Sequence, residues 1–262
     1  MEVGKNENPK LSIKNTMSLQ FNDTTNKKGI IQKIERICKF SDGYISGNSS
    51  VLLDFTADVN MALDSVFSII FEATGTWQFD DSNHTDYPFI TTNLVSGQRD
   101  YTFTSDESGN LILDVYKVMV KDENGYYNDI DPVDQQSDNA MQSFYDGRNT
   151  QGTPTRYDKT GNGIFLDAIP SYSQTAGVKV FINREGSYFT SSDTTKKPGF
   201  VGLHHDYLAL LPAYEYATAN GLSNRNEIRQ MLLEKESAIK KYYRDRTRDE
   251  VLVITSQDIN PI

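Results

Sequence analysis

The spacing of apolar residues changes twice along the chain, from helical to extended and back to helical. Near the start, the apolar residues of KKGIIQKIERICKF recur at helical spacing, which predicts a helix over about residues 27–40. In DFTADVNMALDSVFSIIFEATG a wide apolar stripe predicts a second helix. Thr56 is expected to cap the start of this helix, and Gly75 is expected to end it in the left-handed conformation.

Between Tyr87 and Phe189 the helical spacing gives way to short aromatic and β-branched segments, which predict a sheet. Asn124 and Gly125 supply the two positive-φ positions of a type I′ turn, so we expect a hairpin with strands near 113–121 and 126–131. A second hairpin is expected around residues 161–163, with strands near 155–158 and 164–168. The segment VKVFINRE predicts one more strand, whose inward side chains are Val178, Val180 and Ile182.

Helical spacing returns in LHHDYLALLPAYEYATANG and in SNRNEIRQMLLEKESAIKKYYRDR. Pro212 lies inside the first of these helices, where it removes a backbone donor and is expected to cause a kink. Asn224 and Glu227 have the spacing of a capping box at the start of the second. The apolar stripe expected on this last helix consists of Ile228, Met231, Leu232, Ile239 and Tyr242.

Helices that lie far apart in the sequence can pack together only if the β segment loops out between them. We therefore predict an α+β protein, in which the N-terminal and C-terminal helices form one helical unit. An antiparallel β-sandwich or barrel-like lobe is inserted into this unit, and both termini are extended arms. The expected divisions are an N-terminal arm (1–25), a helical connector domain (26–80 and 200–246), an inserted β domain (81–199) and a C-terminal tail (247–262).

The net charge restricts the classes of partner, and the single cysteine restricts the possible disulfides. The chain has 36 acidic and 26 basic residues, and its net charge of -10 opposes general attraction to nucleic acid or to an anionic membrane. Cys38 stands alone, so we expect a buried thiol and no disulfide framework. No segment has the apolar length of a membrane span or of a signal peptide, so neither is predicted.

The stretch FDDSNHTDY, which begins two residues after Trp77, gathers Asp80, Asp81 and His84. Its oxygen atoms are suitable ligands for a hard cation, but the stretch lacks the central glycine and terminal glutamate of an EF-hand loop. Asp, Asn and Ser side chains that bind their own backbone give the same composition in a turn. We predict a structural turn between helix and sheet, with Trp77 packed at that junction, and neither a metal nor another cofactor.

Catalytic patterns are also weak. The chain has no glycine-rich phosphate loop, nucleophile elbow or zinc-binding helix motif. His204 and His205 are adjacent and cannot share one helix face, and the spacing of the acids selects no catalytic pair. We predict that the protein is not an enzyme. Two alternatives stay open: a carbohydrate-binding or other β-rich surface module, with Trp77 and several tyrosines exposed in a row, and a hydrolase with two converging carboxylates.

Three stretches resemble a known family: TWQFDDSNHTDYPFITTNLVSGQRDYTF, then TPTRYDKTGNGIFLDAIPSY, then REGSYFTSSDTTKKPGF before a helical C-terminus. Together they are similar to the head-to-tail connector adaptors of tailed bacteriophages, over roughly residues 55–250. The resemblance implies a virion structural protein at the neck, made in the host bacterial cytoplasm. It also implies a homo-oligomeric ring, commonly a dodecamer, that contacts the portal protein and the downstream tail proteins. Double-stranded DNA would pass through its lumen without specific binding, and no membrane is involved.

The chain ends are the expected partner-binding parts. The C-terminal tail contains the segment VLVIT, in which four of five residues are apolar and are costly to leave in water. Strand-forming ends of this kind add main-chain hydrogen bonds to a neighbour. We expect the tail to order against a neighbouring subunit or the portal, through the candidate residues Arg246, Arg248, Val251, Leu252, Val253 and Ile254.

Overall fold

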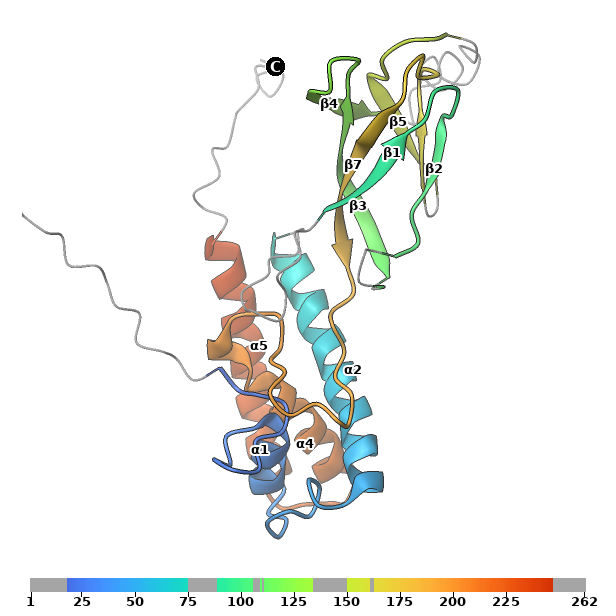
Figure 1. Ribbon diagram of the computed structural model, residues 1–262. Coiled ribbons are helices and arrows are strands. Elements are labelled where there is room, and N and C mark those ends of the chain that lie inside the picture. The colour runs from blue at the N-terminus through green and yellow to red at the C-terminus, as the bar shows by residue number, and fades with distance from the viewer. Residues whose placement is uncertain are drawn as a thin grey trace, which may run out of the picture. The chain divides into compact units, whose positions relative to one another are not determined.

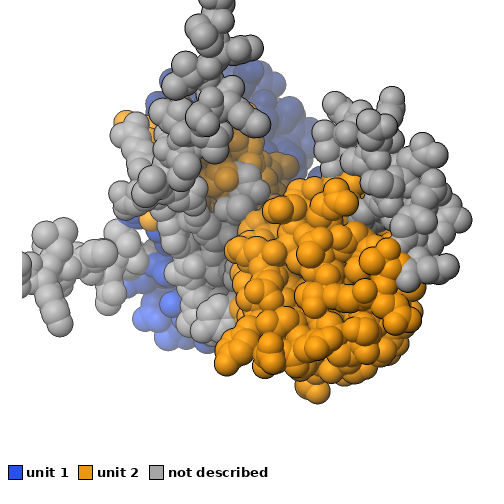
Figure 2. All heavy atoms as spheres, turned by 90° about the horizontal axis from the view of Figure 1, so that it is seen from above, with its two compact units in different colours: residues 1–62, 80–83, 189–235 blue, residues 63–79, 84–188, 236–262 orange. Residues whose placement is uncertain are grey.

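The computed structural model describes residues 18–74, 89–105, 109, 111–133, 150–160 and 163–246. Within these ranges the protein is a mixed α+β protein with four α-helices, one short 3-10 helix and seven strands (Figure 1). Its contacts divide the chain into two compact units, coloured separately in Figure 2. Unit 1 contains residues 1–62, 80–83 and 189–235, and unit 2 contains residues 63–79, 84–188 and 236–262. The domain boundaries expected from the sequence stay a prediction.

The two N-terminal helices are α1 (Ile30–Ile37) and α2 (Ser49–Thr74). Both helices were predicted, but α2 begins earlier than expected, and the prediction that Thr56 is its N-cap is wrong. Thr56 is buried inside the helix, and its hydroxyl donates to the carbonyl of Leu52 at 2.5 Å. Asn48 takes the capping role, because its side-chain oxygen accepts from the amides of Ser50 at 3.2 Å and Val51 at 3.4 Å. Gly75 lies outside the described residues.

The C-terminal helices are α4 (Tyr207–Ala219), which follows the 3-10 helix η1 (Gly202–His204), and α5 (Arg225–Arg246). Asn224 directly precedes α5, as expected of an N-cap residue. Its side-chain amide, however, donates to the carbonyl of Ile37 at 2.9 Å and so connects the start of α5 to the end of α1. The stripe predicted on α5 is partly wrong, since Met231 is 49% exposed and Tyr243, in place of Tyr242, is fully buried.

Contacts between distant parts of the chain hold unit 1 together. The Lys33 ammonium on α1 pairs with Asp206, at the start of α4, at 2.5 Å. The ring of Phe40 lies 4.8 Å from that of Tyr216 on α4. Cys38 is buried and free, as predicted, and burial raises the pKa of its thiol to about 11. These contacts join sequence segments more than a hundred residues apart, a packing that α1 cannot obtain from its own neighbours.

Residues 18–25 were assigned to the N-terminal arm, but their apolar side chains belong to the core of unit 1. Leu19 is 8% exposed and Phe21 is fully buried. The Phe21 ring stacks on Phe189 at 4.7 Å, and its amide donates to the carbonyl of Lys196 at 2.8 Å. Leu19 and Phe21 of the expected arm therefore pack in the core of unit 1, where their burial offsets part of the entropy lost when this segment is ordered.

The seven strands of unit 2 form one curled sheet that resembles half of a barrel, in the order β1-β7-β3-β4-β5-β6-β2 (Figure 1). Six pairs of strands are neighbours in this order, and only β4 and β5 are parallel. The expectation of a purely antiparallel lobe is therefore wrong at this pair, where the long segment between the two strands permits a crossover. The strands are β1 (Phe89–Leu94), β2 (Asp100–Thr102), β3 (Ile112–Lys121), β4 (Tyr127–Pro132), β5 (Arg156–Thr160), β6 (Gly163–Leu166) and β7 (Gln174–Arg184).

Both predicted hairpins are present, as β3–β4 and β5–β6. The type I′ turn is wrong, because Gly125 has φ of 85° whereas Asn124 is not among the residues with positive φ. The amide of Gly125 donates to the carbonyl of Asp122 at 3.0 Å, and the Asp122 carboxylate accepts from the amides of Asn124 and Tyr126. This is the three-residue loop in which a type I turn is followed by a left-handed glycine.

One face of the sheet forms the core of unit 2. The predicted inward residues of β7 are confirmed, since at most 1% of each is exposed. Alternate residues of the neighbouring strands meet them, as the period of two requires. The buried cluster consists of Ile90, Leu94, Tyr101, Phe103, Val118, Val120, Ile130, Tyr157, Ile164, Leu166, Val178, Val180 and Ile182.

Candidate functional site

The site residues suggested by the sequence lie almost entirely outside the described residues. Arg246 is the last residue of α5, and nothing further is described of its side chain. The remaining candidates therefore stay predictions, both as a junction turn and as a partner-binding tail. They are Trp77, Asp80, Asp81, His84, Arg248, Val251, Leu252, Val253 and Ile254.

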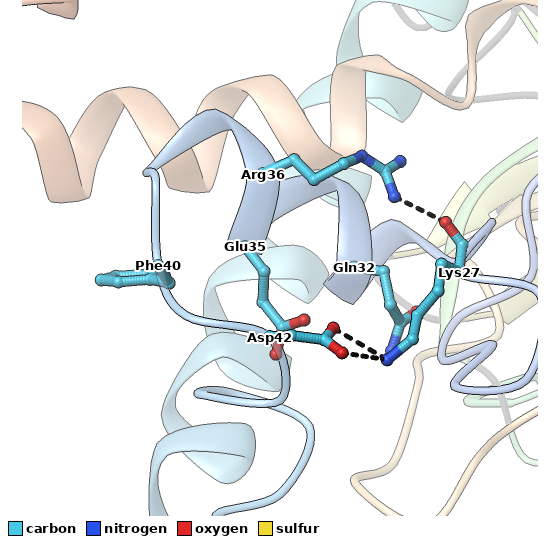
Figure 3. Close-up of a pocket in the computed structure, with 6 residues that line it drawn as sticks. All are labelled: Lys27, Gln32, Glu35, Arg36, Phe40 and Asp42. Atoms are coloured by element: carbon cyan, nitrogen blue, oxygen red, sulfur yellow. Dashed lines mark hydrogen bonds and ion pairs between the residues drawn. The ribbon is translucent and has the colours of Figure 1, made fainter.

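A hollow of about 200 Å³ lies in unit 1 beside α1 (Figure 3). The Lys27 ammonium lies 2.8 Å and 2.9 Å from the two carboxylate oxygens of Asp42. The Arg36 guanidinium donates to the carbonyl of Lys27 at 2.6 Å. The charge of Lys27 is thus paired with that of Asp42, and the Arg36 side chain fixes the backbone at Lys27. The lining residues are Lys27, Gln32, Glu35, Arg36, Phe40 and Asp42.

Glu35 is the buried acid of this hollow, and only 3% of it is exposed. One carboxylate oxygen accepts from the amides of Ile45 and Ser46, each at 2.9 Å, and from the Ser46 hydroxyl at 3.2 Å. Gln32 similarly accepts from the amide of Asp23 at 2.9 Å. Both side chains replace missing backbone partners in the loops beside α1. Their chemistry is therefore that of structural hydrogen-bond acceptors.

We expect Glu35→Ala to lower the free energy of unfolding by about 2–3 kcal/mol, because it leaves the buried amide of Ile45 and the part-buried amide of Ser46 without their acceptor. Glu35→Gln keeps an acceptor oxygen and should cost about 1 kcal/mol. Urea unfolding followed by circular dichroism measures both. The control is Glu234→Ala, at an exposed position inside α5, which should change stability by less than about 0.5 kcal/mol. An equal loss in Glu35→Ala and in the control would contradict this role.

Two adjacent histidines are buried at the start of α4. Nδ1 of His205 lies 3.0 Å from the amide nitrogen of Leu19, and Nε2 lies 2.8 Å from the carbonyl oxygen of Phe200. Because the amide can only donate, Nδ1 is the acceptor and Nε2 carries the proton. Burial lowers the pKa of His205, and also that of His204, to about 4. His205 is therefore neutral, and its two hydrogen bonds join the segment at Leu19 to the segment at Phe200.

A carboxylate cluster connects α2 with α4 in unit 1. Burial raises the pKa of Asp58, and the neighbouring Asp54 raises it further. Burial and the charge of Asp58 likewise raise the pKa of Glu215. The negative charges of Asp54, Asp58 and Glu215 thus gather on one side of unit 1, and a cation from outside this cluster would relieve the repulsion at Asp58 and Glu215.

The outer face of the sheet carries lysines that lie over aromatic rings. Nζ of Lys179 lies 4.8 Å from the centre of the Phe89 ring and 4.1 Å from that of Tyr127. Nζ of Lys117 lies 5.7 Å from the centre of the Phe181 ring and 2.9 Å from the Asp129 carboxylate. The lysine stems cover apolar rings and keep their charges in water. This arrangement makes the solvent side of a curled sheet polar.

The part of the chain that the structure describes shows neither a metal-binding group of side chains nor a helix suited to span a membrane. Within those ranges, no three His, Cys, Asp or Glu side chains gather as a metal-binding group. Among the described helices, none combines the length and the apolar content of a membrane span.

No protein-family model matches this chain, and no curated protein sequence matches it.

The buried hydrogen bonds of Glu35 and His205 were not predicted from the sequence. Glu35 borders the isoleucine face of α1, so a charge beside an apolar face was the available signal. His205 stands at the start of an apolar run, but its two partners, Leu19 and Phe200, are set by the tertiary structure.

Proposed function

We propose that this chain is a non-enzymatic virion protein that forms an adaptor ring between the portal and the tail of a tailed bacteriophage. In this proposal the ring extends the DNA channel at the head-to-tail junction. The β segment is an insertion between the N-terminal and C-terminal helices, and the chain ends contact neighbouring proteins. The observation that carries the proposal is the order of the three family-like stretches between helical segments.

The packing of unit 1 supports this organisation. Segments at residues 18–62 and 189–235 belong to the same compact unit, with most of the β segment between them in sequence. The ion pair of Lys33 with Asp206 and the hydrogen bond of Asn224 to Ile37 both connect the two helical segments. A helical base with a β insertion is the organisation that the changes in apolar spacing predict.

The acidic charge supports a channel that lets DNA pass. Basic side chains that bind phosphates release counterions, and the resulting affinity would hold the genome in place. A chain with a net charge of -10 has the opposite effect. In a ring of identical subunits the charge is repeated around the channel, so the wall repels the duplex.

The first test is the mass of the assembled protein. Light scattering and electron microscopy of the purified chain, alone and mixed with the portal protein, should show a closed ring that joins the portal. A chain that stays single at all concentrations, and that never joins a portal, would contradict the proposal.

The second test concerns the tail. Deleting residues 247–262 should leave the circular dichroism of both units unchanged and should weaken ring assembly or portal docking. The reason is that burying the large apolar side chains of VLVIT contributes about 1.5–3 kcal/mol each. Deleting residues 1–17 is the comparison, and should weaken assembly less, since this segment has fewer apolar anchors. Unchanged affinity and stoichiometry after the tail deletion would show that the tail assignment is wrong.

A further inference from the structure

An apolar stripe on α2 points away from the core of unit 1. We name Leu53, Ala57 and Met61 the outer stripe of α2. All three are exposed, with 60% of Leu53 and 59% of Met61 open to solvent. Their spacing of four residues places them on one face of the helix, opposite the face that carries the buried Val59. A single exposed leucine is ordinary, but an apolar stripe over two helical turns is typical of a helix that packs on a partner.

The charge of α2 restricts what this partner is. From Ser49 to Thr74 the helix contains four acidic residues and no lysine or arginine. Asp54 is exposed directly beside Leu53, and it belongs to the carboxylate cluster with Asp58 and Glu215. Packing two α2 helices against each other would bring two such clusters together. The partner surface must therefore be apolar and basic.

The outer face of α5 has this character. Arg229 and Leu233 lie one turn apart on the helix, and both are exposed, Leu233 to 54%. Both lie away from the face that carries the buried Ile228 and Leu232. Over its full length, Arg225–Arg246, α5 contains seven basic and four acidic residues. We name Arg229 and Leu233 the outer stripe of α5.

We propose that the outer stripe of α2 packs against the outer stripe of α5 in a second copy of this chain, with Asp54 facing Arg229 across the contact. The inference rests on the proposed ring and identifies the surfaces that join its subunits. Because two different surfaces meet, a pair of copies still offers one α2 stripe and one α5 stripe to further copies. Such a contact produces a ring when the rotation between copies closes. Both helices are labelled in Figure 1.

The apolar part of the contact is tested by the double variant Leu53→Gln/Met61→Gln. It should raise the protein concentration at which half of the chains are assembled by at least about tenfold. The matched control is Leu111→Gln/Leu113→Gln in unit 2, where the two leucines are 50% and 51% exposed. Light scattering over a concentration series gives the assembly curve, and circular dichroism shows that the helices are retained.

The charged part of the contact is tested by reversing the charge of each residue. Asp54→Lys alone and Arg229→Glu alone should each weaken assembly about tenfold, because each places like charges across every contact. Carrying both changes in one chain should restore assembly. An equal mixture of the two single variants should also assemble, since the lysine introduced in one variant then meets the glutamate introduced in the other.

The outcomes separate the two proposals. If the wild-type ring forms and the α2 and α5 variants assemble as well as it does, this inference is overturned and the ring stands. If Asp54→Lys strengthens assembly on its own, α2 packs against another α2, and the inference is also overturned. A wild-type chain that stays single, alone and with the portal protein, overturns the ring and this contact together.

Discussion

Lowering the pH from 7 to 4 is expected to remove several kcal/mol from the stability of this protein. His204 and His205 are 7% and 0% exposed, and burial lowers both pKa values from 6.5 to about 4. Between these two pH values the unfolded chain binds more protons than the folded chain. Stability is therefore complete above about pH 6.5, falls as the pH decreases, and levels off below about pH 4.

The loss at His205 has a direct structural cause. Protonation of Nδ1 would place a second N–H opposite the amide of Leu19, where the ring now accepts a hydrogen bond. A shift of this size corresponds to about 3 kcal/mol for each histidine at pH 4. Asp206, Lys197 and Lys235 are the charged groups that modify these two pKa values, and their effects are smaller than that of burial.

Urea unfolding at pH 7, 6, 5 and 4 measures this dependence. Asp58 and Glu215 have raised pKa values and act in the opposite direction, because they favour the folded state as they become protonated. The variant His205→Ala removes the contribution of His205 to the pH dependence. The variant should be less stable at pH 7, and it should lose only about half as much stability as the wild type by pH 4. A variant with the same pH dependence as the wild type would contradict the assignment to His205.

Gly186→Ala is expected to lower the free energy of unfolding by about 2–3 kcal/mol. A Cβ atom at position 186 would lie 1.8 Å from Cε2 and 2.0 Å from Cζ of Phe67. Phe67 is 3% exposed on α2, so its ring cannot move aside without disturbing its neighbours. The cost comes from this collision between side chains in unit 2.

The double variant Gly186→Ala/Phe67→Leu tests the cause. The shorter leucine leaves room for the new methyl group, so the two changes together should cost less than their sum by about 1 kcal/mol or more. Gly97→Ala is the control, because Gly97 has φ of 86° and open space around its Cβ position. It should cost about 1 kcal/mol from backbone strain alone. Strict additivity of Gly186→Ala and Phe67→Leu would show that the two residues do not collide.

Part of the structure was predictable from local spacing. The helices α1, α4 and α5 and the strand β7 lie where the period of apolar residues placed them. The same is true of both hairpins, because strand and turn residues alternate at short range. The predicted turn was wrong where two local interactions favour different turn types. Asn124 and Gly125 permit a type I′ turn, but the carboxylate of Asp122 binds the two amides that select the other loop.

The outer stripe of α2 was less predictable. The exposure of Leu53 and Met61 becomes informative only once the buried face of the helix is known. On α5, Met231 and Tyr242 fitted the helical period as well as Leu232 and Tyr243 did. Which of them is buried depends on where the partner helices lie.

By itself the sequence determined which regions are helical and which are extended, because backbone geometry repeats every 3.6 residues in a helix and every two in a strand. It also determined the net charge of -10, which opposes general binding to DNA. Only the tertiary structure decided that Leu19 and Phe200 share His205, and that Glu35 supports the loop at Ile45. The physical reason is that a buried polar group must find its hydrogen-bond partner wherever the fold brings one, and spacing along the chain carries no record of that partner.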